Sequence, residues 1–169
     1  MFWEFLGILC LIVIYAIGKF LKKNMIGVII ISLTIGLFFE VTMFPMFVYD
    51  TTKLTFFFTI ENRNIPISII LAWGCVLSFS FLLSNALEKK ILKTSSNASF
   101  LLFSLISLLI VGIPAEFVGY HMGFWKYSFS DVSLIFDIPW TAIFGWIFFG
   151  TLFLSTIKSY EGYLNRKRI

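Results

Sequence analysis

Charged residues are scarce in this 169-residue chain: they make up 13% of it, against about a quarter of an ordinary soluble domain. Apolar residues reach 59%, and the mean hydropathy is +0.96. A water-soluble globular protein is therefore excluded. The net charge of +4 does not indicate nucleic-acid binding, because the Lys and Arg residues form no stripe with interleaved aromatic side chains.

Residue types that build common reactive sites are also rare. The two cysteines lie inside apolar runs, so they indicate no disulfide framework. A single histidine excludes a bis-histidine haem and a histidine-rich di-iron centre. No lysine lies inside an apolar run, which argues against a retinal Schiff base. The chain also has no glycine-rich phosphate loop, nucleophile elbow or paired-aspartate prenyl diphosphate motif.

Long apolar runs are what the sequence has in abundance. Five of them can cross about 30 Å of hydrocarbon: residues 2–18, 25–48, 65–87, 100–120 and 138–157. The first run contains Glu4, and it has neither a positively charged leader nor a small-residue cleavage site, so we interpret it as a retained helix rather than a signal peptide. The prediction is one all-α membrane domain, residues 1–169, with five transmembrane helices.

The Lys and Arg residues predict the orientation of these helices. One set of loops carries three of them, and the alternate set carries ten. The three are Lys53, Arg63 and Lys126; the ten are Lys19, Lys22, Lys23, Lys89, Lys90, Lys93, Lys158, Arg166, Lys167 and Arg168. Since cytoplasmic loops carry the excess of positive charge, we expect the N-terminus outside and the C-terminus in the cytoplasm.

Two stretches of the chain repeat one pattern. Aligning Tyr49 with Tyr127 matches the following ten residues in character, and both stretches then reach an Ile-Pro pair. From each proline the spacing to a tryptophan is identical, which aligns Trp73 with Trp146. Such agreement favours a duplicated unit over two apolar hairpins that align by composition alone.

Glu40 and Glu116 occupy equivalent places upstream of the two tyrosines. Residues 25–87 and 100–157 are therefore predicted to form two tandem helix hairpins of the same orientation, related by an axis along the membrane normal. The first helix, residues 2–18, lies outside the repeat. Duplicated hairpins usually share a site at their interface, so we expect the equivalent residues to meet there.

Seven of the nine acidic side chains, Glu4 among them, lie at the ends of the runs or in loops, and only Glu40 and Glu116 lie well within apolar runs. An ionised carboxylate in the membrane costs at least about 2.5–3.5 kcal/mol, and neither glutamate has an intramembrane Lys or Arg to pair with. Each should be paired or protonated and should face the bundle interior. One interpretation is a hydrogen bond to a neighbouring helix; the equivalence of Glu40 and Glu116 favours the other, a shared site.

Three residues that follow Glu116 in the sequence are further candidates for the site. For His121 the commonest role is that of a plain interfacial residue. Among functional roles, a hydrogen-bond partner or proton relay for Glu116 is favoured over a zinc site with Glu116 and Asp137. Gly119 and Gly123 have the small-residue spacing that permits close helix approach or leaves room for an elongated substrate.

Aromatic residues gather toward the predicted outer boundary, where a belt at headgroup depth is their usual role. They are Trp73, Trp125, Trp140, Trp146, Tyr49, Tyr120 and Tyr127. Trp73 and Trp146 lie deeper than a belt requires, and facing inward they can stabilise a cation through their ring faces. Alternation in residues 53–59 and 129–135 indicates short strands or reentrant turns over the site, with interfacial coil as the alternative.

The stretch EFVGYHMGFWKYSFSDVSLIFDIPWTAIFGW resembles the integral-membrane carotenoid biosynthesis proteins, which include carotenoid hydratases of the bacterioruberin type. It is more distantly similar to the small lycopene cyclase subunits. The residues that match the motif are Glu116, Gly119, Gly123, Tyr127, Pro139 and Trp146. The first half of the chain matches only through the repeat, and the glutamate pair that follows a proline in the small cyclases is absent, because Pro114 is followed by Ala115.

This resemblance implies an enzyme that hydrates or cyclises a long isoprenoid or carotenoid double bond. A buried protonated carboxyl can protonate such a bond, and the carbocation is then captured by water or by another double bond. Neither reaction needs a metal or organic cofactor. We expect Glu116 as the acid and Glu40 as partner acid or base. The predicted substrate-binding residues are Tyr127, Trp73, Trp146, Tyr49, Gly119, Gly123 and His121.

Two other functions stay open at this point. In a small proton-coupled transporter or carrier, the two glutamates would be the coupling sites, and a continuous polar path would cross the bundle. In a structural or assembly subunit they would be locked in interhelical hydrogen bonds with no cavity. The expected partners are a lipophilic small molecule and the lipid bilayer, and a homo-oligomer or a partner membrane subunit is left open.

Overall fold

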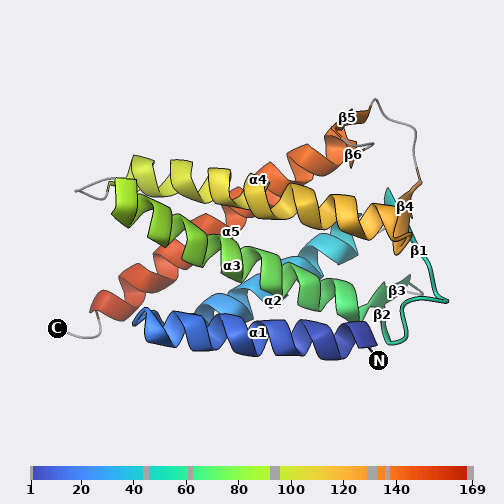
Figure 1. Ribbon diagram of the computed structural model, residues 1–169, viewed down its shortest axis with the longest axis horizontal. Helices are drawn as coiled ribbons and strands as arrows, with labels where there is room; N and C mark the ends of the chain where they lie inside the picture. Colours follow the sequence, from blue (N-terminus) through green and yellow to red (C-terminus); the bar gives the residue numbers. More distant parts are fainter. Residues whose placement is uncertain are drawn as a thin grey trace.

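The computed structural model describes residues 2–43, 46–60, 63–91, 96–128, 133–135 and 138–166. Its helices are α1 (Phe2–Phe20), α2 (Met25–Met43), α3 (Ile67–Ile91), α4 (Asn97–His121) and α5 (Trp140–Arg166) (Figure 1). All five are long and apolar enough to cross a membrane. The prediction of an all-α membrane fold with five transmembrane helices is confirmed.

The ends of the helices differ from the apolar runs. The run at 25–48 is too long as a helix, because α2 ends at Met43 and Phe47–Tyr49 forms strand β1 instead. Aromatic and β-branched residues such as these fit an extended, paired strand. At the other end of the bundle, α5 continues to Arg166, beyond the last apolar residue predicted, since polar helix formers extend a helix without extending its hydropathy.

Short strands pair at the end of the bundle that holds the N-terminus (Figure 1). They are β1 (Phe47–Tyr49), β2 (Phe57–Ile60), β3 (Arg63–Pro66), β4 (Trp125–Tyr127), β5 (Ser133–Ile135) and β6 (Ile138–Pro139). β2 pairs with β3 and β5 with β6, both antiparallel, so each repeat has a hairpin that leads through Ile-Pro into its second helix. The strand interpretation of residues 53–59 and 129–135 holds for 57–59 and 133–135. Residues 53–56 form no strand, and residues 129–132 lie outside the described part of the chain.

Helices α2 to α5 form a closed ring, in which α2 and α4 each pack against both α3 and α5. Helix α1 lies outside this ring, packed mainly on α3. The arrangement is therefore two hairpins, α2 with α3 and α4 with α5, plus one extra helix, as the repeat predicts.

The pairing of β1 with β4 reveals how the two hairpins are related. The offset of 78 residues that aligns Tyr49 with Tyr127 also aligns Phe47 with Trp125. In the sheet, Phe47 lies opposite Tyr127, the equivalent of Tyr49, and Tyr49 lies opposite Trp125, the equivalent of Phe47. Exchanging the two strands therefore leaves the pairing unchanged. Identical chains make such self-complementary contacts about a two-fold axis. A pseudo-two-fold axis therefore passes through the centre of this pair, along the helices.

Basic residues mark the opposite end of the bundle. Lys19 ends α1, Lys89 and Lys90 lie in the last turn of α3, and all three are far from the strands (Figure 1). Lys53 and Lys126 are at the strand end. Lys93, Lys167 and Arg168 lie outside the described residues. The charge asymmetry thus separates the two ends of one bundle, and which end faces the cytoplasm stays a prediction.

Candidate functional site

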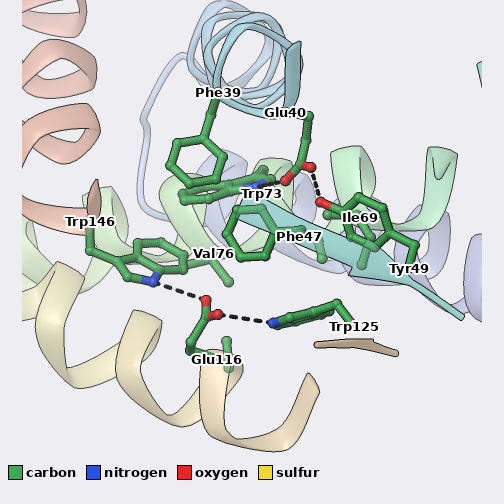
Figure 2. A pocket seen from close by; sticks show the side chains of 12 residues that line it. Phe39, Glu40, Phe47, Tyr49, Ile69, Trp73, Val76, Glu116, Trp125 and Trp146 are labelled. Atoms are coloured by element: carbon green, nitrogen blue, oxygen red, sulfur yellow. Dashed lines mark hydrogen bonds between the residues drawn. The ribbon is translucent and has the colours of Figure 1, made fainter. Parts of the chain in front are cut away.

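Glu40 lies in the last turn of α2 and is 1% exposed. Its Oε2 accepts a hydrogen bond from the Tyr49 hydroxyl of β1, and its Oε1 accepts one from Trp73 Nε1 of α3 at 2.8 Å (Figure 2). Strand β1 and helix α3 thus each supply one hydrogen-bond donor to the Glu40 carboxyl. All three residues belong to the first repeat.

Glu116 lies near the end of α4 and is 6% exposed. Its Oε1 accepts hydrogen bonds from the Tyr127 hydroxyl at 2.5 Å and from Trp125 Nε1 at 3.1 Å. Its Oε2 accepts one from Trp146 Nε1 at 3.2 Å (Figure 2). Glutamate, tyrosine and tryptophan therefore form the same cluster in both repeats, and Trp125 adds a third donor to the second cluster.

Both clusters line one central cavity of about 60 Å³. The rings of Trp73 and Trp146 meet between them with centroids 4.1 Å apart, and Figure 2 shows the Phe47 ring also lying between the two carboxyls. A space of this size holds a few water molecules, not a long ligand. No Lys or Arg in the described ranges forms an ion pair with either glutamate, so Tyr hydroxyls and Trp N–H groups alone satisfy them.

A larger groove of about 430 Å³ adjoins the central cavity. It runs between α1, α3 and α4, and its lining is almost entirely apolar. The residues that line both spaces are Ile69, Ala72, Val76, Ala115 and Trp125. The two carboxyls are therefore next to an apolar volume that the central cavity by itself does not provide.

Glycines place each tryptophan beside its glutamate. Gly36 and Gly112 lie four residues before Glu40 and Glu116, one turn along the same helix face. A Cβ at Gly36 would overlap Trp73, and a Cβ at Gly112 would overlap the Trp146 ring. Sequence analysis missed this pair, although the alignment of the two glutamates brings the glycines into register.

Trp125 is a second residue that sequence reasoning missed as part of the site. It was assigned only to the aromatic belt, yet it donates to Glu116 and lines both the cavity and the groove. The available signal was its equivalence to Phe47: both precede the tyrosine of their repeat by two residues, and both line the central cavity.

The expectation that His121 serves Glu116 is wrong. His121 is exposed at the end of α4; its Nδ1 lies 3.1 Å from the Phe117 carbonyl oxygen, and its ring stacks on Phe117. Five residues at 3.6 per turn rotate a side chain well away from Glu116, which explains the misplacement. Within the described part of the chain no three His, Cys, Asp or Glu side chains come together for a metal, and Asp137 lies outside it.

The two predicted glycines do not line the central cavity. Gly119 lines the groove, where a Cβ would overlap the Trp125 ring, so it permits the approach that brings Trp125 to Glu116. Gly123 has φ +68° and turns the chain from α4 into β4. Such a positive φ favours glycine. Gly123 thus contributes through the backbone and not as a binding surface.

The two tyrosines are built to remain hydrogen-bond donors. Burial, and then the neighbouring Glu40 carboxyl, raise the pKa of Tyr49 well above its ordinary value. Burial and the Glu116 carboxyl likewise raise the pKa of Tyr127. Since a raised pKa keeps a phenol protonated to higher pH, both hydroxyls donate to their glutamates throughout the physiological range.

Comparisons with protein-family models, with curated proteins and with solved structures give no significant match. Function is therefore argued from the site. Its distinguishing feature is that two equivalent carboxyls line one cavity, and that four aromatic donors of the duplicated pattern and one further tryptophan donate hydrogen bonds to them.

Proposed function

We propose that the protein is a membrane-embedded acid catalyst that hydrates or cyclises a double bond of a long isoprenoid or carotenoid through a carbocation. One observation carries the proposal: two buried carboxyls from duplicated hairpins line one aromatic cavity that adjoins an apolar groove. A carboxyl that leaves water without a cationic partner is favoured in its neutral form, which is the form that donates a proton.

Glu116 is proposed as the acid. Its carboxyl proton passes to one carbon of the double bond, and the positive charge appears on the adjacent carbon. The hydrogen bonds from Tyr127, Trp125 and Trp146 then stabilise the carboxylate that forms. Glu40 has two such donors, which makes it the weaker candidate for the same step and a suitable partner base.

The ring faces of Trp73 and Trp146 are the proposed shield for the cation, since aromatic faces attract positive charge. In hydration, a water molecule adds to the cation and then gives one proton back to the Glu116 carboxylate, directly or through Glu40. In cyclisation, a second double bond of the same chain attacks the cation, and the new cation loses a carbon-bound proton to the Glu116 carboxylate. Both sequences return the acid to its starting state, and the resemblance to carotenoid biosynthesis proteins supports either.

The test is pigment and isoprenoid analysis of a lycopene-producing host that expresses the protein. The wild type is expected to yield hydrated or cyclised products in the whole isoprenoid extract. Glu116→Gln keeps the size of the side chain but has no acidic proton, so it should lower the product by roughly 10² to 10⁴, the range of general acid catalysis. Glu40→Gln should cause a smaller loss.

Membrane insertion and thermal stability of each variant are the controls. Unchanged isoprenoids with properly inserted wild-type protein would contradict the proposal. So would product formation by Glu116→Gln at the wild-type rate, because no acidic proton is left at that position.

A proton-coupled transporter is the second candidate, and one observation favours it. Buried hydroxyls follow the α3 interfaces toward the basic end of the bundle: Ser32 and Ser78 are 3.0 Å apart between Oγ atoms, and Ser84 and Ser104 are 2.7 Å apart. Proton uptake by liposomes that contain the purified protein distinguishes the two functions. Transport predicts a flux that Ser84→Ala reduces, whereas the enzyme predicts none.

A further inference from the structure

Two equivalent grooves flank the central cavity. The first is the groove of about 430 Å³ between α1, α3 and α4, and the second, of about 490 Å³, lies between α2 and α5. The offsets that align the two glutamates and the two tryptophans also align four lining residues of the first groove, Ser68, Ala72, Cys75 and Val118, with Thr141, Gly145, Phe148 and Thr42 of the second. The pseudo-two-fold axis thus relates the grooves as well as the glutamates.

The first groove reaches the carboxyls and the second does not. Val76 and Ala115 line both the first groove and the central cavity. Their equivalents are Phe149 and Phe39, whose rings make an edge-to-face contact with centroids 4.5 Å apart. The lining of the second groove shares no residue with that of the central cavity. Large side chains therefore close one approach where small ones leave the other open.

Helix α1 adds a wall to the open approach. Trp3, Leu6, Gly7 and Cys10 of α1 line the first groove, whereas no residue of α1 lines the second. A volume near 430 Å³ lies within the range of about 300–1,000 Å³ that small-molecule sites occupy. The second groove has a similar volume, so the two grooves differ not in size but in the wall that α1 adds and in the residues that the first shares with the central cavity.

One polar atom in this apolar lining has no partner among the residues that the structure describes. Ser68, in the first turn of α3, is 7% exposed, and its Oγ makes no hydrogen bond to any of them. A buried hydroxyl without a partner is unfavourable, and in native structures such a group calls for an explanation. A ligand that is apolar along its length and carries one oxygen atom would supply both the contact and the hydrogen bond.

We propose that the groove between α1, α3 and α4 binds a linear isoprenoid that carries one hydroxyl or carbonyl group, with that oxygen at Ser68 and a double bond at the glutamate cavity. This inference rests on the proposed function and narrows its substrate class. The chain enters sideways from the bilayer on the α1 side, and only there, because Phe39 and Phe149 close the equivalent path.

The first test uses a photoreactive probe: geranylgeraniol, a linear isoprenoid alcohol, fitted with a diazirine, and the matching hydrocarbon without the hydroxyl. Both are added to the purified protein in nanodiscs, irradiated, and the adducts are mapped by peptide mass spectrometry. We expect adducts on α1, α3 and α4. Adducts mainly on α2 and α5, or spread evenly over the lipid-facing helices, would overturn the proposal.

The second test compares Val118→Phe with Thr42→Phe. These positions are equivalent and exposed, one in each groove, so both substitutions add the same ring at little risk to folding. Val118→Phe should reduce labelling of the groove by at least about tenfold, and Thr42→Phe should leave it unchanged. Equal effects of the two variants would contradict entry from the α1 side.

The third test is Ser68→Ala. Removal of an unpartnered buried hydroxyl should leave thermal stability equal or slightly higher, yet binding of the alcohol should weaken roughly three- to tenfold while binding of the hydrocarbon does not change. Equal effects on the two probes would refute the role of Ser68. Labelling in the groove by a protein that forms no product would support this binding site and remove the proposed acid catalysis, so the two failures are distinguishable.

Discussion

The two repeats agree in the hydrogen bonds to their glutamates and differ in the residues next to these clusters. Each carboxyl receives the tyrosine hydroxyl and tryptophan N–H of its own hairpin. Beside the clusters, however, Val76 of the first repeat is equivalent to Phe149 of the second, and Ala115 of the second is equivalent to Phe39 of the first. Duplication has kept the polar cluster in both repeats, while side-chain volume at equivalent positions decides which of the two grooves adjoins the shared cavity.

Exchange of the equivalent residues Val76 and Phe149 is expected to have the largest effect on product formation. Val76→Phe copies the closed side onto the open side and should lower product formation by at least about tenfold, because even small misplacement of a reacting group can reduce rates about a hundredfold. Phe149→Val copies the open side onto the closed one and should retain activity. Product yield per inserted protein in the lycopene-producing host measures both.

Equal losses in these two variants would contradict access by the α1 side alone, because removing the Phe149 ring closes no path to the cavity. Thermal denaturation in detergent separates loss of access from loss of folding, since each change also alters the volume of a packed interface.

The equivalent glycines offer a test of the shared architecture. Gly36→Val and Gly112→Val should each destabilise the protein by about 1–3 kcal/mol, the usual cost of overpacking. Gly36→Val should cost more, because its new side chain meets the Cβ of Trp73, which cannot move without the backbone, whereas the Gly112 change meets the Trp146 ring. Denaturation in mixed micelles measures the difference, and tolerance of both changes would contradict the tight tryptophan placement.

The tyrosine hydroxyls should have smaller and unequal effects. Tyr49→Phe leaves Glu40 with one donor, while Tyr127→Phe leaves Glu116 with two. Hydrogen bonds between membrane helices are worth about 0.6 kcal/mol on average and up to about 1.7. Tyr49→Phe should therefore be the more destabilising change in the same denaturation assay, and the reverse order would contradict the count of donors.

The smallest expected effect is on the titration of the Tyr49 and Tyr127 hydroxyls. The pKa values of Tyr49 and Tyr127 are both raised by burial and by the neighbouring carboxyl, so both phenols stay protonated as pH rises past the point where exposed tyrosines ionise. In an ultraviolet titration to about pH 11, the double variant Tyr49→Phe, Tyr127→Phe should lose no phenolate signal relative to wild type. A smaller phenolate signal in the variant would show that at least one of the two phenols is accessible.

Much of the fold could be predicted because it depends on quantities that are local in sequence. Apolar length fixes the number of helices, and the equal Pro-to-Trp spacing predicts that Trp73 and Trp146 are equivalent. The structure adds that each donates a hydrogen bond to the glutamate of its own repeat. The end of α2 at Met43 could not be predicted from hydropathy, since the following Phe47–Tyr49 segment is equally apolar and forms a strand only because β4 pairs with it.

Other features depend on tertiary contacts that no spacing reveals. His121 is close to Glu116 in sequence, but the rotation of the helix directs its side chain away, to the Phe117 carbonyl oxygen. Glu4 is buried at the start of α1, where its Oε1 accepts a hydrogen bond from the Phe56 backbone N–H, a contact made across the loop after β1. The groove at Ser68 likewise forms only because α1 packs against α3. The sequence predicts that α1 exists but not where it packs.

Deuterium incorporation tests the proton transfer from Glu116 most directly. Purified protein in nanodiscs is incubated in D₂O with lycopene and, separately, with geranylgeraniol, and the products are analysed by mass spectrometry after exchange back into H₂O. Since the carboxyl exchanges with solvent, acid catalysis predicts a product with one carbon-bound deuterium from the wild type and none from Glu116→Gln. A product without carbon-bound deuterium, or equal incorporation in both proteins, would contradict proton transfer from this carboxyl.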